Sequence, residues 1–207
     1  MYYNYNIFFF EYFIFIYIKM KYGKKIWGPL TWYLLHIFSV HNNLKESTND
    51  LKHNYFIFYT TFIHILPCTM CSRHYSDIIN FIHPINEDKI NNNYIKKWVY
   101  ETHNIVNDLL NKKIYKYSKL KGDYKDINNN KIFFTIKILL KNIDFIKLSL
   151  YKYDQIYNFF INFCILYPDP IIRNKLELLI NHNEFKNIET PKQFIKWYNE
   201  CFLNFYF

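Results

Sequence analysis

The scarcity of glycine limits the folds open to this chain more than any other feature, because only three glycines and six prolines occur in 207 residues. Glycine supplies the positive-φ backbone that many tight turns and phosphate-binding loops require. Its near-absence argues against turn-rich β-sandwiches and against glycine-dependent nucleotide loops. Because 51% of the residues are hydrophobic, a wholly disordered chain is excluded. The length suits one mid-sized domain or a small domain with an appendage.

The charge of the chain is positive but not concentrated. Lysine and arginine number 26 against 17 aspartates and glutamates, a net charge of +9, and the excess is spread over both halves. Nucleic-acid-binding surfaces usually show clustered basic residues, so no specific nucleic-acid partner is expected. Tyrosine, phenylalanine, isoleucine, asparagine and lysine dominate the composition, and all five have AT-rich codons. The aromatic content of 22% is therefore not taken as a binding signal.

The N-terminal extension, 1–23, contains the apolar run IFFFEYFIFIYI at 7–18, which Glu11 interrupts. The run is shorter than the roughly 20 residues of a membrane-spanning helix. It lacks the basic start and the small-residue cleavage site of a signal peptide, so a cytoplasmic location is expected. Three interpretations stay open: an extension that packs on the domain, a weak membrane anchor, or translated upstream sequence with the true start at Met20.

From Lys24 onward the hydrophobic pattern becomes helical. Apolar side chains recur at helical spacing in the first stretch, namely at Trp27, Leu30, Leu34, Leu35, Ile37 and Phe38. Pro29 suits a first helical turn, where its missing N–H is not needed. The pattern predicts helices over about 24–40, 51–66, 68–82 and 94–112. We therefore expect an all-α fold, with a four-helix bundle over 24–117.

The second half of the chain carries fewer signals. The segment 118–130, SKLKGDYKDINNN, is typical of a linker. Residues 131–207 are expected to form a mostly helical C-terminal domain of unknown role. Its helices are predicted over 131–150, 154–166, 169–182 and 190–205. No internal repeat and no catalytic constellation is evident there.

The motif that carries chemistry is a Cys-x-x-Cys, Cys68-Thr-Met-Cys71, at the expected start of the third helix. Its spacing allows the two sulfurs to form a disulfide, and a helix N-terminus favours the thiolate. A redox dithiol is one interpretation. A zinc-binding interaction module using Cys68, Cys71, His74 and His83 is a second, and inert thiols are a third. A thioredoxin-like site would need a preceding buried strand, which the helical neighbours do not support.

Two further clusters lie on the first and fourth helices. Trp32 and His36 are four residues apart and share a face, as do His103, Asn104 and Asn107. Taken singly, Trp32 is typical of a core aromatic residue and His36 of a buried histidine with a hydrogen-bond partner. Asn104 and Asn107 taken singly are typical of solvent-exposed residues. Their occurrence with the cysteine motif, on three helices of one small bundle, instead indicates a common site.

Three motifs in register resemble a known family. WGPLTWYLLH (27–36), PCTMCSRHY (67–75) and W-x4-HNIVNDLLNKKIY (98–115) resemble the flavin-linked sulfhydryl oxidases of the Erv/ALR family, in order and in spacing. The versions from large DNA viruses are the most similar. The resemblance covers roughly 24–117. It implies a helical bundle that holds FAD beside the Cys-x-x-Cys, usually as a homodimer, and a viral source would place it in the host cytoplasm or the virion.

The resemblance also implies residue roles. Cys71 would be the flavin-proximal cysteine and Cys68 the interchange cysteine that meets substrate. Lys112 would lie near the cofactor phosphates. The implied FAD-binding residues are Gly28, Trp32, His36, Cys71, His103, Asn104, Val106, Asn107, Lys112 and Tyr115. The implied activity is disulfide formation in protein dithiols or in a thioredoxin-like relay protein, with electrons passing through the cysteine pair and FAD to oxygen, giving hydrogen peroxide.

The chain also departs from the family pattern. Pro29 stands where many cellular members carry arginine, so one polar FAD contact is expected to be missing. The structural disulfide of cellular members falls at positions that match Tyr100 and Tyr117, and its loss removes about 3 kcal/mol in the chain-entropy model. Cys164 and Cys201 lie outside the matched region. A structural disulfide, a shuttle pair and buried free thiols stay open for them.

Overall fold

The computed structural model describes most of the chain beyond the N-terminal extension. The described residues are 23–42, 44, 48–141, 143, 148–181 and 188–202, with side chains described up to 200. The apolar run at 7–18 and its three interpretations lie outside them. Every regular element within the described ranges is a helix or a helical turn, which confirms the all-α prediction. No helix in these ranges is long and apolar enough to cross a membrane.

The first part of the chain forms the helices expected of it. Helix α2 spans Lys24–Val40, α3 spans Asn49–Thr61, α4 spans Thr69–Asp77 and α5 spans Asn92–Leu109. A 3-10 turn, Phe62–His64, extends α3, and a π-helical turn, Ile78–Ile82, extends α4. A further 3-10 turn, Glu87–Lys89, precedes α5.

Two predicted details of these helices are wrong. Pro29 lies inside α2 rather than in its first turn, because the helix already begins at Lys24 behind the N-cap Gly23. The proline is exposed, so water can satisfy the carbonyl that its missing N–H leaves free. The fourth helix ends at Leu109 rather than near 112, because Asn111 takes a left-handed φ of 50°. Asparagine tolerates this conformation at helix ends.

The second part of the chain is also helical. It contains α7 over Asn129–Lys141, α8 over Leu150–Ile165, α9 over Pro170–Asn181 and α11 over Pro191–Trp197, with a π-helical turn at Tyr198–Phe202. The helix predicted over 131–150 ends at Lys141, and the next begins four residues earlier than predicted because Ser149 caps it. Segment 118–130 contains a 3-10 turn, Tyr117–Lys119, and the short helix α6, Leu120–Asp123.

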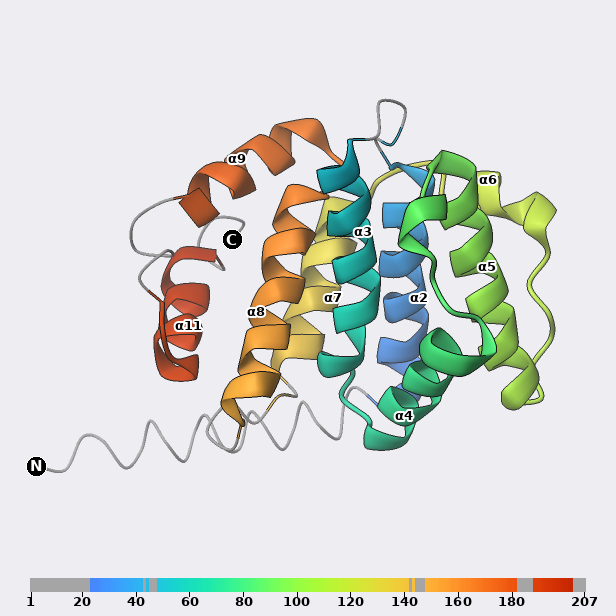
Figure 1. Cartoon of the computed structure of the whole chain (residues 1–207), viewed down its shortest axis with the longest axis horizontal. Helices are drawn as coiled ribbons and strands as arrows, with labels where there is room; N and C mark the ends of the chain where they lie inside the picture. Colours follow the sequence, from blue (N-terminus) through green and yellow to red (C-terminus); the bar gives the residue numbers. More distant parts are fainter. Residues whose placement is uncertain are drawn as a thin grey trace, which may run out of the picture.

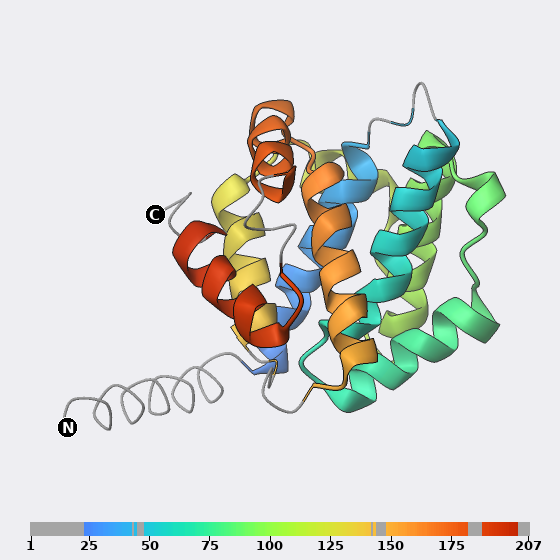
Figure 2. The same ribbon diagram turned by 60° about the vertical axis from the view of Figure 1, so that its left-hand side comes forward.

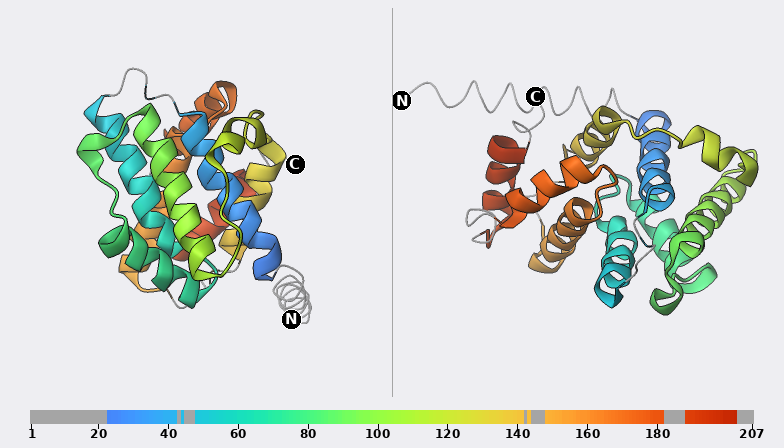
Figure 3. Two further views of the ribbon diagram at one scale, coloured as in Figure 1. Left: turned by 90° about the vertical axis from the view of Figure 1, so that its right-hand side faces the viewer. Right: turned by 90° about the horizontal axis from the view of Figure 1, so that it is seen from above.

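The helices pack around α2 and α3. Helix α5 lies against one side of α2, α7 packs against another side of α2, and α8 packs against α3 (Figure 1). Helix α4 lies across the end of the bundle at which α2 begins. Turned views show α9 and α11 stacked beyond α7 and α8, on the opposite side from α5 and α6 (Figures 2 and 3).

One aromatic core joins the two parts of the chain. The ring centroids of Phe38 and Phe58 are 4.8 Å apart, those of Phe58 and Phe159 are 5.2 Å apart, and those of Phe38 and Phe163 are 5.4 Å apart. All four rings are fully buried. Residues of α2 and α3 therefore share their core with α8. The division into domains at 118–130 stays a prediction.

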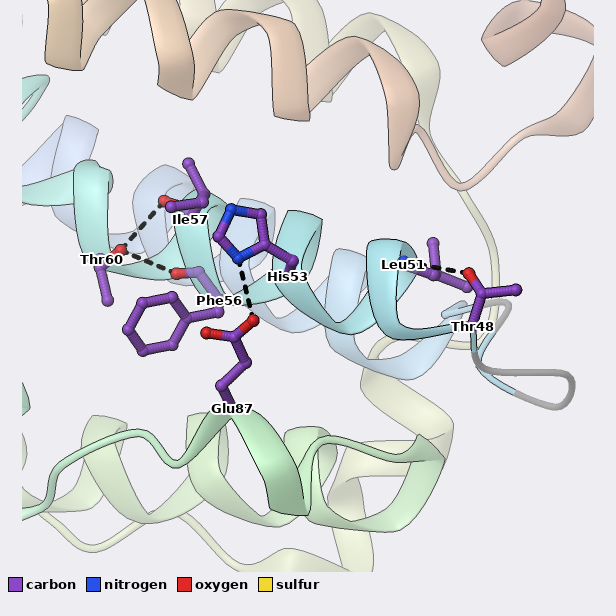
Figure 4. Close-up of polar contacts among 7 residues, drawn as sticks. All are labelled: Thr48, Leu51, His53, Phe56, Ile57, Thr60 and Glu87. Atoms are coloured by element: carbon purple, nitrogen blue, oxygen red, sulfur yellow. Dashed lines mark hydrogen bonds and ion pairs between the residues drawn. The ribbon is translucent and has the colours of Figure 1, made fainter.

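Polar contacts along α3 fix the helix that leads to the cysteines (Figure 4). Thr48 caps its start by accepting the Leu51 N–H at 3.2 Å. The exposed His53 Nδ1 lies 2.9 Å from Glu87 Oε1 and links α3 to the turn before α5, a contact that adds little stability at such exposure. Near the end of α3, the Thr60 hydroxyl donates to the Phe56 and Ile57 carbonyls at 2.8 and 3.3 Å, as Figure 4 shows.

Replacing Phe159 by alanine is expected to destabilise the whole chain in a single unfolding transition, because its ring stacks on Phe58 of the other half. Removing a fully buried phenylalanine typically costs about 3–5 kcal/mol. Urea unfolding followed by circular dichroism measures the loss. Phe81→Ala is the matched control, because Phe81 is 80% exposed and its loss should change stability by less than about 0.5 kcal/mol. Two separate transitions, with only one shifted, would contradict the shared core.

Candidate functional site

The cysteine pair lies at the N-terminus of α4. Pro67 ends the preceding turn, and Cys68 is the N-cap of the helix, with an extended backbone (φ −126°, ψ 114°). The Cys68 sulfur accepts the backbone N–H of Cys71 at 3.3 Å. Both cysteines are partly exposed free thiols. The prediction that the motif opens a helix is confirmed, and neither cysteine is fully buried.

Hydrogen bonds tie α4 to the core. The Ser72 hydroxyl donates to the Ile63 carbonyl at the start of α4. The buried Tyr75 hydroxyl donates to the Tyr59 carbonyl at 3.0 Å, and the Tyr59 hydroxyl donates to the Leu35 carbonyl of α2 at 3.0 Å. The cysteine motif is therefore held, through α3, in a fixed position relative to α2.

The two thiols differ in their electrostatic surroundings. Burial raises the pKa of Cys68, but hydrogen bonds from Cys71 and from Lys24, together with the Lys24 charge, outweigh it and leave the pKa below the usual value. Burial and the neighbouring Cys68 raise the pKa of Cys71 to about 11. In the reduced pair, Cys68 is thus the thiol that ionises first. Lys24 was not among the residues singled out from the sequence.

A second cluster joins α2 to α5. The rings of Trp32 and His103 are nearly parallel, with centroids 4.1 Å apart. His36 Nε2 lies 2.9 Å from His103 Nδ1, so the N–H of one ring donates a hydrogen bond to the bare nitrogen of the other. Trp32 and His36 of α2, which the sequence places on one face, therefore contact His103 of α5 directly. We call the group formed by Trp32, His36, His103, Tyr115 and Tyr124 the aromatic cluster.

Both histidines of this cluster are neutral near neutral pH. Burial, followed by repulsion from His103, lowers the pKa of His36 to about 3. Burial, followed by the Lys112 charge, lowers the pKa of His103 to about 4. His36 is fully buried, and its Nδ1 has no hydrogen-bond partner among the described residues. The buried hydroxyls of Thr31 on α2 and Thr102 on α5 also lack partners within that part of the chain.

The two asparagines of α5 hold Tyr115 against the cluster. Asn104 accepts the backbone N–H of Tyr115 at 2.8 Å and donates to its carbonyl at 3.0 Å. Asn107 is buried and donates to Asn104 at 3.4 Å. Their interpretation as freely exposed asparagines is therefore wrong. The Tyr115 ring stacks beside His103, with centroids 5.8 Å apart.

Tyr124 is a site residue that the sequence analysis missed. Its ring stacks on His36, with centroids 4.6 Å apart, and its carbonyl oxygen lies 2.8 Å from His41 Nε2. The neighbouring Asp123 accepts the Tyr115 hydroxyl at 2.8 Å. Because 118–130 has the composition of a linker, nothing in its pattern marks Tyr124 as inward-facing. Only the path of the chain over the end of α2 brings the ring to His36.

The row formed by Lys24, Gly28, Trp32 and His36 connects the cysteines to the aromatic cluster. Its members follow one another at four-residue spacing along α2, which places Trp32 about 12 Å and His36 about 18 Å along the axis from Lys24. A Cβ added to Gly28 would meet no atom within 4 Å. Open space therefore lies directly beside Gly28.

The remaining predicted residues lie on α5 and just after it. Val106 is partly buried on α5. Lys112 is exposed, its backbone N–H donates to the Asn107 carbonyl at 2.8 Å, and its charge reaches His103. The predicted residues of α2 and α5 thus lie where these two helices meet, and the exposed Lys112 follows directly after α5.

The zinc alternative is not supported by the geometry. Across the described ranges, no group of three or more His, Cys, Asp and Glu side chains is arranged to hold a metal ion. His83 instead stacks on Trp98 and lies 3.5 Å from Glu101, and His74 is exposed on α4. The four proposed ligands therefore do not converge.

The other cysteines and the tyrosine pair occupy separate places. Cys164 is a fully buried free thiol of α8, whose pKa burial raises well above the usual value. The side chain of Cys201 lies outside the described residues, so the three alternatives for this pair stay open. Tyr100 and Tyr117, the positions at which the resemblance implies a disulfide in cellular members, meet edge to face with centroids 4.9 Å apart. Such aromatic pairs contribute about 0.5–1.5 kcal/mol.

Acid is expected to destabilise the protein through the buried His36 and the partly buried His103. Their folded-state pKa values lie below the unfolded value of 6.5. As the pH falls below about 6.5, the unfolded chain therefore binds protons that the folded chain does not. Each histidine then lowers stability by up to about 1.4 kcal/mol per pH unit, until the pH reaches its folded-state pKa.

This effect is measured by urea unfolding between pH 7 and pH 4.5. The variant His103→Gln should flatten the pH dependence by about one histidine's share. A slope equal to that of the unaltered chain would show that the surroundings of His103 do not lower its pKa.

The chain is similar to known proteins over its central part. The model of the Erv1/Alr family matches residues 29–125. An FAD-linked sulfhydryl oxidase of African swine fever virus is 33% identical over 103 residues, which cover 48% of this chain and 80% of the relative. The enzyme of that name from a second isolate is 32% identical over 99 residues, with the same shares covered.

A probable FAD-linked sulfhydryl oxidase of Acanthamoeba polyphaga mimivirus is 27% identical over 92 residues, covering 44% of this chain and 63% of that relative. No solved structure matches the chain. The matched residues include both cysteines of the motif and every member of the aromatic cluster. The chain covers four fifths of a relative to which it is 33% identical, and the Erv1/Alr model matches residues 29–125. The chain therefore belongs to the Erv1/Alr family.

Proposed function

We propose that this chain is a flavin-linked thiol oxidase that forms disulfide bonds in protein substrates. The observation that carries the proposal is the row of residues along α2, which begins beside the Cys68–Cys71 pair and ends in the aromatic cluster. An elongated cofactor lying along this row would place one end at the thiols and the other among the stacked rings. Family membership supports the same activity.

The residues present fit FAD. Flat aromatic rings stack well on other rings, and Trp32, His103 and Tyr124 offer such surfaces. The unpartnered His36 Nδ1 offers a buried hydrogen-bonding atom, which is costly to leave unpaired. The space beside Gly28 leaves room along the helix, and the Lys112 charge suits phosphates. Val106 and the paired Asn104 and Asn107 would complete the α5 side.

Bound FAD would accept two electrons from the reduced cysteine pair and pass them to oxygen, giving hydrogen peroxide. The chain's own residues carry out the exchange that precedes this. A substrate thiolate attacks the Cys68 sulfur of the Cys68–Cys71 disulfide, which breaks that bond and releases Cys71 as a thiolate. A second substrate thiolate then attacks the substrate sulfur, so the substrate leaves oxidised and Cys68 leaves as a thiolate.

The partners follow from this chemistry. Protein dithiols or a thioredoxin-like relay protein would reach the motif at the partly exposed end of α4. Cys164 is fully buried in α8, which argues against its use as a shuttle while that helix stays packed.

A homodimer would need a surface other than the face of α2 and α3 that α7 and α8 cover. A cytoplasmic location stays part of the proposal, because such an oxidase supplies oxidising power that this compartment lacks.

The first test is the absorbance spectrum of the purified protein. A flavin band that bleaches with anaerobic dithiothreitol and returns on admission of air supports the proposal. A colourless protein that takes up no added FAD overturns it.

Cys71→Ser is expected to abolish thiol-dependent oxygen consumption while the protein keeps its flavin, because it removes the only thiol paired with Cys68 in the motif. An oxygen electrode with dithiothreitol as substrate measures turnover, and absorbance measures the flavin content. Cys164→Ser is the matched control and should retain turnover, because Cys164 is buried away from the motif. Turnover that persists in Cys71→Ser would contradict the assignment of this pair.

Tyr124→Ala is expected to weaken flavin retention about fivefold, because it removes a stacking surface worth on the order of 1 kcal/mol. Tyr124→Phe keeps the ring and should retain flavin like the unaltered chain. Tyr151→Ala, at a position 65% exposed on α8, controls for the general effect of losing a tyrosine. Fluorescence titration with FAD measures the three affinities. Equal affinity in Tyr124→Ala would remove Tyr124 from the cofactor site.

A further inference from the structure

The start of α8 lies beside the turn that leads into the cysteine motif. The ring of Tyr151, in the first turn of α8, meets the ring of His64 edge to face, with centroids 5.9 Å apart. His64 ends the 3-10 turn Phe62–His64 and precedes Cys68 by four residues. Four residues span at most about 14 Å between Cα atoms. The first turn of α8 is therefore a near neighbour of Cys68.

The same 3-10 turn joins α8 to α4. It packs against both helices, and the centroid of its Phe62 ring lies 5.7 Å from that of Tyr75 in α4 and 5.8 Å from that of Phe159 in α8. The Ser72 hydroxyl of α4 donates to the carbonyl of Ile63 in the turn. Two views place the starts of α4 and α8 at the same end of the bundle (Figures 1 and 2). The two helix starts are therefore held in fixed positions relative to each other.

Exposed apolar side chains mark the end of the bundle at which α4 and α8 begin. Met70, between the two cysteines, is 53% exposed, and Leu150 and Tyr151 are 72% and 65% exposed. Exposed apolar residues are ordinary when scattered singly, whereas a group of them marks a surface for protein contact. We call Met70, Leu150 and Tyr151 the apolar rim. Its two α8 residues lie beyond residue 125, where the match to the Erv1/Alr family ends.

We propose that the apolar rim is the docking surface for the protein substrate, which binds as an unfolded, cysteine-bearing segment with apolar side chains. The proposal rests on the proposed function, because it assigns a substrate class to the Cys68–Cys71 site. It also adds two residues of the C-terminal half, Leu150 and Tyr151, to those that determine which thiols are oxidised.

The exchange reaction decides what covers the rim. A substrate must form a disulfide with Cys68, so its chain has to run across the surface around the start of α4. With the 5.9 Å between the two rings and the side-chain lengths added, the Tyr151 ring lies within roughly 25 Å of the Cys68 sulfur. About seven extended residues span this distance. The near neighbours of the substrate cysteine are therefore the residues that contact the rim.

An apolar surface at this place favours chains that have not yet folded. Cysteine is among the residue types most often buried in folded proteins, so the segments that contain it commonly contribute to a core. Before folding, the apolar side chains of such a segment are exposed, and contact with the rim removes them from water. A folded thioredoxin-like relay protein keeps its core side chains covered. The rim therefore favours an unfolded dithiol segment over a relay protein.

The test measures how fast Cys68 captures a peptide in the full-length Cys71→Ser variant. The peptide cysteine carries a thionitrobenzoate group, and the Cys68 thiolate attacks the peptide sulfur. A bond forms between Cys68 and the peptide, the bond to thionitrobenzoate breaks, and its electron pair leaves with the thionitrobenzoate thiolate. Mass spectrometry follows the growth of the Cys68 fragment that carries the peptide.

Two peptides of equal length and charge are compared. One has phenylalanine and leucine within about seven residues of its cysteine, and the other has serine at the same positions. Leu150→Ser with Tyr151→Ser removes the α8 part of the rim, whereas Leu150→Met with Tyr151→Phe keeps it apolar. The matched control is Ile171→Ser with Leu178→Ser on α9, where the two side chains are 71% and 74% exposed.

The parent is expected to capture the apolar peptide about tenfold faster than the serine peptide, which corresponds to about 1.4 kcal/mol. The double serine variant of α8 should lose most of this preference. The Leu150→Met, Tyr151→Phe variant should keep it, and the α9 variant should match the parent. Equal capture of both peptides by the parent, or a preference that persists in the α8 serine variant, overturns the proposal.

Two other occupants of the rim are distinguished by further measurements. A parent that is dimeric by light scattering, shows no peptide preference and becomes monomeric in the α8 serine variant would have the rim as an interface between copies. A flavin-loaded chain that oxidises a folded thioredoxin-like dithiol faster than an apolar dithiol peptide, equally in parent and α8 serine variant, would have a relay protein as its substrate. Either result overturns the proposal.

Peptide capture separates this inference from the proposed function, because it needs neither flavin nor oxygen. A colourless protein that still prefers the apolar peptide would lack the oxidase activity and keep the docking surface. A yellow, active protein without the preference would keep the oxidase function and lose the docking surface. In the flavin-loaded parent, the ratio of kcat/KM for an apolar dithiol peptide to that for dithiothreitol should fall about tenfold in the α8 serine variant.

Discussion

The burial of α2 is the constraint on which the rest of the structure depends. Leu34, Ile37 and Phe38 are fully buried because α2 packs against α5 on one side and α7 on another, while Tyr59 of α3 bonds to its Leu35 carbonyl. A helix enclosed in this way carries its polar residues into the interior as well. His36 can lie there only as a neutral ring paired with His103. The site is thus a consequence of how the central helix packs.

Desolvation acts in opposite ways at the two ends of α2. At the aromatic cluster it keeps both histidines uncharged, which suits stacking and hydrogen bonding rather than proton transfer. At the cysteine end the same effect would raise both thiol pKa values, and it does so for Cys71. The pKa of Cys68 is instead lowered, because its sulfur accepts the Cys71 N–H at the start of α4 and the positive charge of Lys24 acts on it. One physical effect and one local exception therefore distinguish the aromatic cluster from the cysteine pair.

The C-terminal half completes the core around this site. The similarity to the Erv1/Alr family covers residues 29–125, whereas α7 and α8 lie beyond it and pack directly on α2 and α3. Phe159 and Phe163 fill the face that Phe38 and Phe58 present. Burying this much aromatic surface is strongly stabilising.

The sequence by itself determined the all-α class, the approximate helix positions, the Cys-x-x-Cys at a helix start and the residues of α2 and α5 that meet at the site. Local periodicity and family motifs carry that information because both depend on near neighbours in the chain. The tertiary structure alone decided that Tyr124 stacks on His36, that the charge of Lys24 lowers the pKa of Cys68 and that one core joins both halves. These contacts join segments far apart in sequence, and the polar, lysine-rich composition around Tyr124 and Lys24 carries no period that would reveal which side chains turn inward.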